Sequence, residues 1–568
     1  MIEISSINPG LVLILGAVLV PFLPHLVRRV YILALPAAGF ALVYQLQPGT
    51  LVTLEVLGMT LEPLQVDRLS LVWGYIFNIA AFLSFLFAWH ERDTMQQVSG
   101  LIYAGAAIAA VFSGDLVTLF IYWELTGVSS VFLIWASRNE AALRCGMRYL
   151  LIQVLSGVIL LAGAIGWYQQ TGSIDFSHIG IDTLAGKLIF LAFGIKCAFP
   201  LLHNWLQDAY PQATVTGTVV LSAFTTKLAV YALARGFAGT EILIYIGATM
   251  TAFPIFYAVI ENDLRRVLAY SLNNQLGFMV VGVGIGTEMA LNGTAAHAFS
   301  HILYKALLFM SMGAVLYRVG TCKGSELGGL YKSMPWTTGF CIVGAASISA
   351  FPLFSGFISK SMILTAVAED HRWFIWATLL FASAGVFHHS GIKIPYFAFF
   401  AHDSGYRVKE APWNMLLAMG ITAFLCIFIG TYPTILYDIL PYAVDYKPYT
   451  PYHVIQQLQL LMFSALAFTV LMLTRIYPPE LRSTNLDTDW FYRVLGPTVV
   501  GRIVQALAAI GTAAEDALTK GVVGTIATIK RHHGPEGLMA KTLHLSSMVF
   551  WVVALLAFVL ILDFVRGV

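Results

Sequence analysis

Long apolar stretches separated by short polar segments run along almost the whole chain. Crossing the hydrocarbon core of a bilayer, roughly 30 Å thick, takes about 20 apolar residues of α-helix. An apolar window moved along the sequence finds about 16 such stretches. Their centres lie near residues 16, 38, 80, 106, 126, 158, 196, 224, 250, 276, 303, 350, 385, 421, 465 and 556. The pattern therefore predicts an all-α protein that crosses the membrane about 16 times.

Two segments depart from this pattern. Residues 50–67, TLVTLEVLGMTLEPLQVD, alternate polar and apolar positions in places, which favours a short external hairpin over a helix. Between about residues 475 and 545, a polar loop, RSTNLDTDWFYR, leads into the stretch GRIVQALAAIGTAAEDALTKGVVGTIATIK. This stretch is amphipathic and about 45 Å long as a helix, so we expect it to lie along the membrane surface. A surface linker with some helicity is the alternative.

Basic residues occur in alternate loops, and the loops between them are acidic or nearly neutral. Because basic loops face the cytoplasm, both termini are predicted on the outer face of a bacterial cell (inner) membrane. The basic loops contain Arg28 and Arg29, Arg92, Arg138, Arg144 and Arg148, Arg265 and Arg266, Lys323 and Lys332, and Arg407 and Lys409.

Composition agrees with a membrane protein, since 58% of the residues are hydrophobic and only 11% are charged. The net charge of +2 is spread over the loops and gives no sign of nucleic-acid binding. The five cysteines are scattered without a C-x-x-C pair, which argues against an iron–sulfur cluster or a thiolate metal site. We expect no cofactor and no bound metal.

The tetrapeptide Ala-Phe-Pro-Leu occurs twice inside apolar stretches, at residues 198–201 and 350–353. Proline inside a helix removes a backbone hydrogen bond and clashes with the preceding turn, so both stretches are predicted to be broken helices. Each also contains a lysine, Lys196 in the first and Lys360 in the second. Proline-interrupted stretches at corresponding places in two halves indicate the ion path of a transporter.

Ionisable residues inside the apolar stretches are the candidates for that path. His297, His301 and Lys305 lie four residues apart and share one face of a helix. Each ionisable group at mid-membrane costs about 2.5–3.5 kcal/mol, so chance placement of Glu124, Lys196, Lys227, Lys305 and Lys360 together is improbable. The candidate set is Glu124, Lys196, His203, Lys227, His297, His301, Lys305, Lys360 and Lys393.

Some candidates have a second explanation. His203 follows the proline of the first repeat, Pro200, and its side chain could instead form a structural hydrogen bond at the end of a helix. Lys227 and Lys393 can place their ammonium groups at a membrane surface if they lie near helix ends. The sequence leaves open whether His388 and His389 belong to the path.

Four motifs, in this order, resemble the antiporter-like subunits shared by respiratory complex I and the multisubunit Mrp-type Na+/H+ antiporters. They are YWELTGVSS, GIKCAFPLLHNWLQDAYPQATVTGTVVLSAFTTKLAVYALAR, HAFSHILYKALLF and AFPLFSGFISK, and the resemblance covers roughly residues 60 to 430. GIKIPYF is most similar to the D-type subunits of Mrp antiporters. The resemblance implies two inverted five-helix repeats with broken seventh and twelfth helices.

The resemblance also implies roles for the candidate residues. Glu124 and Lys196 would form the ion pair of the first half-channel, Lys227 would connect the halves, and Lys360 would end the second. The stripe from His297 to Lys305 would be the middle of a hydrated proton path, because neutral imidazole both donates and accepts. The family commonly has FHxWLPDAH where this chain has LHNWLQDAY, which weakens the inference for the entrance near His203.

These observations predict a proton-translocating subunit of a multisubunit Na+/H+ antiporter, not an enzyme in itself. Its expected partners are other membrane subunits, the lipid bilayer, H+ and Na+. Two alternatives stay open: a proton-pumping subunit of a complex I-like redox complex, and a subunit that couples proton flux to a partner for inorganic carbon uptake. The expected segments are N-terminal helices and hairpin 1–95, repeats 96–236 and 237–402, C-terminal helices 403–475, a cytoplasmic amphipathic strap 476–545 and a final transmembrane helix 546–568.

Overall fold

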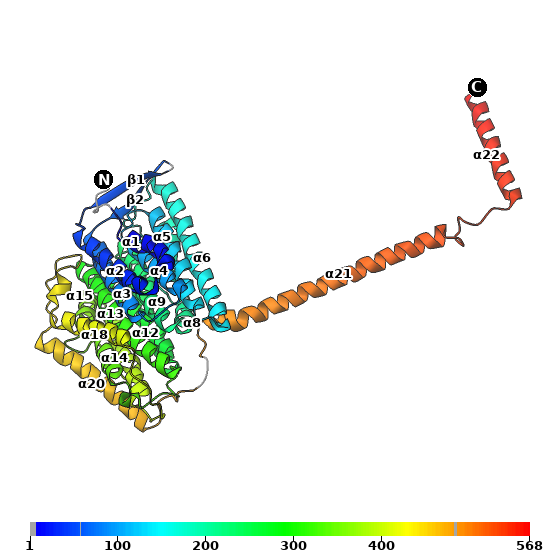
Figure 1. Ribbon diagram of the computed structural model, residues 1–568. Helices are drawn as coiled ribbons and strands as arrows, with labels where there is room; N and C mark the ends of the chain where they lie inside the picture. Colours follow the sequence, from blue (N-terminus) through cyan, green and yellow to red (C-terminus); the bar gives the residue numbers. More distant parts are fainter. Residues whose placement is uncertain (1–6, 57, 482–484, 568) are drawn as a thin grey trace. The chain divides into compact units, whose positions relative to one another are not determined.

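The computed structural model describes residues 7–56, 58–481 and 485–567. By their internal contacts these residues divide into two compact units, Met1–Asp487 and Thr488–Val568. The first unit is a bundle of α-helices with one small β-hairpin (Figure 1). The predicted all-α membrane fold is therefore confirmed.

The first part of the bundle contains helices of very different lengths. They are α1 (Gly10–Leu19), η2 (Val20–Phe22), α2 (His25–Gln45), α3 (Arg68–Phe87), α4 (Thr94–Val111), α5 (Leu116–Trp135), α6 (Glu140–Thr171), α7 (Leu184–Lys196), α8 (Asn204–Gln212), α9 (Val215–Ala223) and α10 (Thr225–Gly236).

The rest of the bundle follows from residue 242. It contains α11 (Ile242–Ile260), α12 (Leu264–Ile285), α13 (Glu288–Val319), η3 (Leu330–Lys332), α14 (Pro335–Ile348), α15 (Ser355–Glu369), α16 (Trp373–Val386), η4 (Phe387–Ile392), α17 (Lys393–Pro395), η5 (Tyr396–Phe400), α18 (Trp413–Thr431), α19 (Thr434–Tyr437) and α20 (Pro451–Leu473).

Most of the long helices begin at a residue whose side chain accepts a hydrogen bond from a backbone N–H of the first turn. Such a cap satisfies a donor that has no partner within the helix. The capping residues are Asp67, Asp93, Asp115, Asn139, Thr183, Thr214, Asp263, Thr287 and Thr450.

The predicted number of membrane crossings is not confirmed by the lengths of the helices. In the described part of the chain, 11 helices are long and apolar enough to cross a membrane by length and composition. The predicted count of 16 is not confirmed, because several predicted stretches consist of short or divided helices. The stretches centred near residues 196 and 350 are each two half-helices, α7 with α8 and α14 with α15.

The predicted hairpin is confirmed. Strands β1 (Leu51–Val56) and β2 (Met59–Gln65) pair antiparallel, and Val56 lies opposite Met59. Residue 57 of the predicted hairpin lies outside the described residues.

The two predicted helix breaks are confirmed and share one backbone conformation. Between α7 and α8, φ is +61° at Ala198 and +71° at Leu201. Between α14 and α15, φ is +57° at Ala350 and +75° at Leu353. The first and fourth residues of each Ala-Phe-Pro-Leu repeat are therefore left-handed, so the sequence repeat is also a structural repeat.

Helix α13 lies at the centre of the bundle. It packs against α3, α9, α12, α14, α15 and α18, and its residues from Ala290 to Val315 are all buried. The stripe of ionisable residues on α13 therefore lies in the protein core and does not face the surrounding lipid.

The second unit contains η6 (Phe491–Leu495), α21 (Gly496–His533) and α22 (Leu545–Arg566). At 1.5 Å per residue α21 is about 57 Å long, nearly twice the roughly 30 Å hydrocarbon thickness. Polar and apolar side chains lie on opposite faces of α21. The polar face carries Arg502, Gln505, Asp516 and Lys520, and the apolar face carries Ile503, Leu507, Ile510 and Leu518. The amphipathic helix is confirmed, while its position on the membrane surface stays a prediction. Residues 482–484 of the preceding polar loop lie outside the described residues.

Candidate functional site

The first candidate residues lie where α5 and α7 meet. Lys196, the last residue of α7, is fully buried and donates hydrogen bonds to the carbonyl of Trp123 and, at 3.0 Å, to Oγ1 of Thr126. Its Nζ lies 4.5 Å from the centre of the Trp123 ring. Glu124 lies between these two contacts in the sequence and interacts electrostatically with Lys196. Its Oε1 has no hydrogen-bond partner within the described part of the chain.

Gly157 on helix α6 leaves room for the Glu124 carboxylate. A Cβ atom built at Gly157 would lie 1.3 Å from Oε1 of Glu124. No side chain can therefore replace this glycine unless the carboxylate moves. No sequence signal selected Gly157, whose lack of a side chain leaves space for the Glu124 carboxylate.

His203 lies at the break between α7 and α8, and Lys227 lies at the interruption between α9 and α10. His203 precedes α8, is 1% exposed, and its Nε2 is 3.1 Å from Oδ2 of Asp487. Lys227 is fully buried just after the interruption at Phe224 between α9 and α10, and its Nζ donates to the carbonyl of Ser222 at 2.5 Å. Lys227 thus satisfies a carbonyl that the interrupted helix leaves without its usual partner.

The stripe on α13 lies entirely within the core, with His297, His301 and Lys305 each 0% exposed. Nδ1 of His297 is 3.2 Å from Oγ of Ser359. Both ring nitrogens of His301 lack a hydrogen-bond partner among the residues that the structure describes. His301 interacts electrostatically with Lys305 and with Lys227. The structure therefore brings the end of the first repeat close to the stripe.

Lys305 begins a chain of hydrogen bonds that crosses three helical segments. Its Nζ donates to Oγ of Ser271 on α12 at 2.8 Å. Oγ of Ser390 in η4 donates to Oγ of Ser271, also at 2.8 Å, and lies 2.8 Å from Nδ1 of His389. His389, left undecided by the sequence, therefore connects to the stripe through two serines.

Lys360 lies on α15 beside the stripe, next to the Ser359 that contacts His297. Its Nζ donates to the carbonyl of Ile348, the last residue of α14, at 3.1 Å. Lys196 ends the first half of its broken helix, whereas Lys360 lies in the second half of its own. The two lysines that the sequence paired therefore occupy different positions in the structural repeat.

Lys393 makes a different kind of contact. Its Nζ donates to the carbonyls of Ala258, Val259 and Glu261 at 3.2, 2.7 and 2.6 Å, and lies 3.0 Å from Oε1 of Glu480. It therefore caps the end of α11 within a buried ion pair. The ammonium is buried and does not extend to a membrane surface.

Sequence reasoning missed several polar residues of this network. Ser271 and Ser390 carry no charge and barely change the hydropathy of their helices, so no sequence signal selected them. Glu480 and Asp487 lie in a polar region where buried side chains were not expected. No group of three or more His, Cys, Asp or Glu residues that could hold a metal ion occurs in the described ranges.

Taken together, the buried groups can hold and pass protons. Ammonium, imidazole, carboxyl and hydroxyl groups alternate from α5 through α13 to α15, and each can donate or accept a proton or a hydrogen bond. Where neighbouring groups are too far apart for a direct hydrogen bond, proton transfer needs a bridging water, and such waters occur between buried polar groups in proteins.

Comparisons with known proteins agree with the resemblance in the motifs. Residues 113–385 match the family described as NADH:quinone oxidoreductase/Mrp antiporter, TM. A Na(+)/H(+) antiporter subunit of Alkalihalophilus pseudofirmus is 28% identical over 76% of this chain and 61% of its own length. Hydrogenase-4 component B of Escherichia coli is 27% identical over 58% of this chain and 55% of its own length.

A cyanobacterial relative is similar in a shorter region. NAD(P)H-quinone oxidoreductase chain 5 of Synechocystis is 32% identical over 49% of this chain and 45% of its own length. The matched region thus spans between 45% and 61% of the length of these three relatives.

Two solved structures share the fold. A chain of the Mrp complex from Dietzia aligns with a TM-score of 0.69 and 19% identity, covering 83% of this chain and all of that one. A chain of the archaeal membrane-bound sulfane sulfur reductase aligns with a TM-score of 0.71 and 20% identity, covering 98% of this chain and all of that one.

Proposed function

We propose that this chain, a relative of the ion-translocating membrane subunits of Mrp antiporters and complex I-type enzymes, translocates protons in a multisubunit Na+/H+ antiporter. The observation that carries the proposal is a row of ionisable side chains, each at most 1% exposed, through the core of the bundle. Each such group costs about 2.5–3.5 kcal/mol in a membrane, so a row of five is costly to bury. They are Lys196, Lys227, His301, Lys305 and Lys360.

In the first half of the path, the charges of Glu124 and Lys196 stabilise each other, because an isolated charge in a low-dielectric interior is costly. Movement of the Glu124 carboxylate away from Lys196 favours release of the Lys196 proton. Lys227 then receives it at the interruption between α9 and α10. The proposed first half-channel corresponds to residues 96–236.

The second half of the path begins at His301. Its imidazole takes a proton at one ring nitrogen and gives one up from the other, which returns it to the neutral form. Water bridges the separations to Lys227 and Lys305. Lys360 ends the route, in the proposed second half-channel of residues 237–402.

The partners in this proposal are other membrane subunits, since the relatives are themselves named as subunits or components of larger assemblies. The chain supplies the proton path and needs no cofactor of its own. A redox-driven role is the second candidate, favoured by the similarity to NAD(P)H-quinone oxidoreductase chain 5.

Everted membrane vesicles that contain the complete complex test the source of energy. We expect Na+ to dissipate a pre-formed pH gradient in these vesicles, measured with a pH-sensitive acridine dye, and to have no effect in vesicles that lack this chain. Li+ and K+ added in parallel report the choice of cation. A gradient that forms only with an electron donor and ignores all three cations would contradict antiport and favour the redox-driven role.

The proposed orientation places the termini outside the cytoplasm of a bacterial cell and α21 along the cytoplasmic membrane surface, as part of the strap 476–545. We expect Gln505→Cys and Asp516→Cys, on the polar face of α21, to react with a membrane-impermeant maleimide in everted vesicles but not in intact cells. The five native cysteines are buried, which keeps the background low. Labelling in intact cells would contradict both the strap and the orientation.

A further inference from the structure

Two carboxylates from the polar region between α20 and α21 are buried in the first unit. The side chain of Glu480 is 7% exposed and that of Asp487 is 2% exposed. Carboxylates in connecting segments are ordinarily solvated, and burial of a charged group is costly unless it is paired or hydrogen-bonded. Their burial therefore needs a reason beyond connecting two helices.

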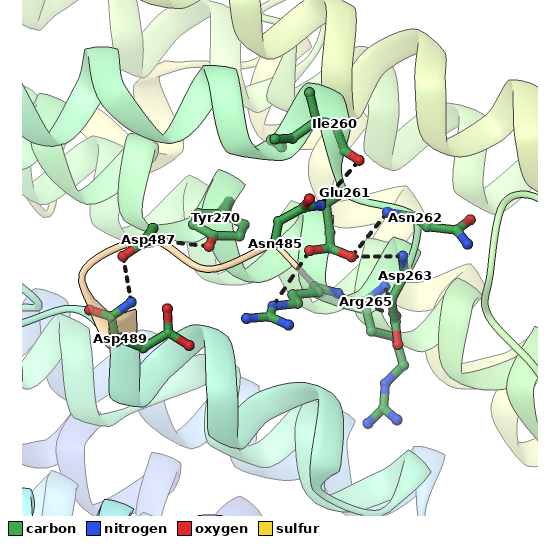
Figure 2. A network of polar contacts seen from close by, with 12 residues as sticks. Ile260, Glu261, Asn262, Asp263, Arg265, Tyr270, Asn485, Asp487 and Asp489 are labelled. Atoms are coloured by element: carbon green, nitrogen blue, oxygen red, sulfur yellow. Dashed lines mark hydrogen bonds and ion pairs between the residues drawn. The ribbon is translucent and has the colours of Figure 1, made fainter. Parts of the chain in front are cut away.

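Asp487 lies between the two proposed half-channels. Its Oδ2 is 3.1 Å from Nε2 of His203 and accepts a hydrogen bond from the Tyr270 hydroxyl at 3.0 Å, while its Oδ1 accepts one from Nδ2 of Asn204 at 2.6 Å. Figure 2 shows the bond to Tyr270. His203 and Asn204 lie at the start of α8, and Tyr270 belongs to α12.

The surroundings of Asp487 contain further charged groups. Arg266 and Glu261 both interact with Tyr270, and Nε of Arg266 lies 3.6 Å from Oε2 of Glu261. Asn485, two residues before Asp487, donates to the carbonyl of Ile260 at 3.3 Å, as Figure 2 also shows. Asp487 therefore lies near the end of α11 and the start of α12, in a site built from both repeats.

His203 is placed to pass a proton onward from Asp487. One ring nitrogen, Nε2, faces the carboxylate, whereas Nδ1 is buried without a hydrogen-bond partner in the described part of the chain. An imidazole with one nitrogen at a proton donor and the other directed elsewhere is suited to relay a proton.

Glu480 has a comparable position in the second half. Its Oε1 lies 3.0 Å from Nζ of Lys393, and Lys393 interacts electrostatically with His389. His389 is the far end of the hydrogen-bonded chain that reaches Lys305 through Ser390 and Ser271.

Burial raises the pKa of the Glu480 carboxyl, an effect that Lys393 opposes and the neighbouring Glu261 reinforces. A carboxyl whose pKa moves toward neutral pH exchanges protons more readily under physiological conditions. Tyr477 is a further titratable group that interacts with Glu480.

We propose that Asp487 and Glu480 load protons into the first and second half-channels, through His203 and Lys393 respectively, an inference that rests on the proposed function. In the first half, the O–H bond of protonated Asp487 breaks as an N–H bond forms at Nε2 of His203, leaving a carboxylate beside an imidazolium. The imidazolium then releases its Nδ1 proton to water and becomes neutral, and exchange of the remaining proton from Nε2 to Nδ1 through water readies Nε2 for the next transfer. Tyr270 and Asn204 stabilise the carboxylate that remains, and Asp487 takes up the next proton from water. In the second half, the Lys393 ammonium first gives one proton to water on the side of His389, and the amine that is left takes the proton of Glu480, whose O–H bond breaks.

Asparagine and glutamine substitutions separate proton loading from a purely structural role. Asp487→Asn keeps the size of the side chain and one acceptor oxygen but cannot carry the proton. We expect it to slow proton movement in everted vesicles by about tenfold or more, since a positioned proton-transfer group contributes about 10²–10⁴-fold. Asp487→Glu should retain part of the rate with a shifted pH profile. Glu480→Gln should behave like Asp487→Asn.

Asp445→Asn is the matched control, because Asp445 is an exposed carboxylate in the segment that precedes α20. It should transport at the wild-type rate. Wild-type rates and an unchanged pH profile in Asp487→Asn and Glu480→Gln, at matched complex levels, would overturn the inference. If Asp487→Asn fails to assemble, the transport rate of Glu480→Gln tests the inference. This variant should assemble, because Lys393 keeps its three carbonyl partners. Absence of proton movement in wild-type vesicles would instead contradict the proposed function.

Discussion

Replacing Lys196 with alanine is expected to reduce proton-coupled transport to less than about a tenth of the wild-type rate, because a positioned proton-transfer group contributes about 10²–10⁴-fold. The ammonium contacts Trp123 and Thr126 on either side of Glu124, so its loss removes the positive charge that interacts with the Glu124 carboxylate. Glu124→Gln should give a similar loss. The measurement is the initial rate of cation-driven dissipation of the pH gradient in everted vesicles, normalised to the amount of assembled complex. Near-normal rates in either variant would contradict the assignment of the first half-channel.

Gly157 provides a steric test of the same carboxylate in which no ionisable residue is replaced. Gly157→Ala forces Oε1 of Glu124 to move, since the new Cβ would lie 1.3 Å from it. We expect transport to fall with Gly157→Ala and to persist with Gly166→Ala on the same helix, where the new Cβ would lie 3.3 Å from the Cβ of Ala185. Equal rates in the two alanine variants would show that the position of Glu124 is not critical.

Replacing His301 with leucine is expected to have the second large effect, again leaving less than about a tenth of the rate. The imidazole interacts electrostatically with both Lys227 and Lys305, and leucine at this position cannot take up or release a proton. An unsatisfied buried polar group costs about 1–3 kcal/mol, so leucine should leave the thermal stability of the complex equal or higher. Loss of transport with retained stability separates a relay from a packing role.

A graded series sharpens this prediction. His301→Gln should keep part of the rate, because an amide orders water without exchanging protons at neutral pH. Lys305→Arg should transport poorly, since a guanidinium does not release its proton. His178→Leu, in an exposed loop, is the control. Wild-type transport in His301→Leu at matched protein level would place the stripe among the structural groups and move the proton route elsewhere.

The sequence predicted those features that depend on local pattern. Proline within Ala-Phe-Pro-Leu indicated both helix breaks, and the four-residue spacing from His297 to Lys305 put three ionisable groups on one buried helix face. Alternation in residues 50–67 indicated the hairpin. Each of these features is determined by interactions between residues close in the sequence. A single stretch of sequence is therefore enough to predict it.

Features that depend on contacts between distant residues could not be read in this way. Lys393 looked like an ammonium near a membrane surface, but carbonyls more than 130 residues away hold it in the core. Ser271 and Ser390 became path candidates only because the fold brings their hydroxyls within 2.8 Å. The count of 16 crossings stays unconfirmed, since several of the apolar stretches consist of short or divided helices.

The left-handed alanine and leucine residues in the two helix breaks bear on how this protein can move. A left-handed conformation costs a residue with a side chain roughly 1–2 kcal/mol, whereas glycine adopts it freely. A flexible hinge would be built more easily with glycine, which also tolerates the intermediate conformations of a swinging helix. Ala198, Leu201, Ala350 and Leu353 instead hold each break in one arrangement, as stiff corners. The helices beside such breaks stay fixed. A path through them opens and closes by rotation of long side chains and by the filling and emptying of small water clusters.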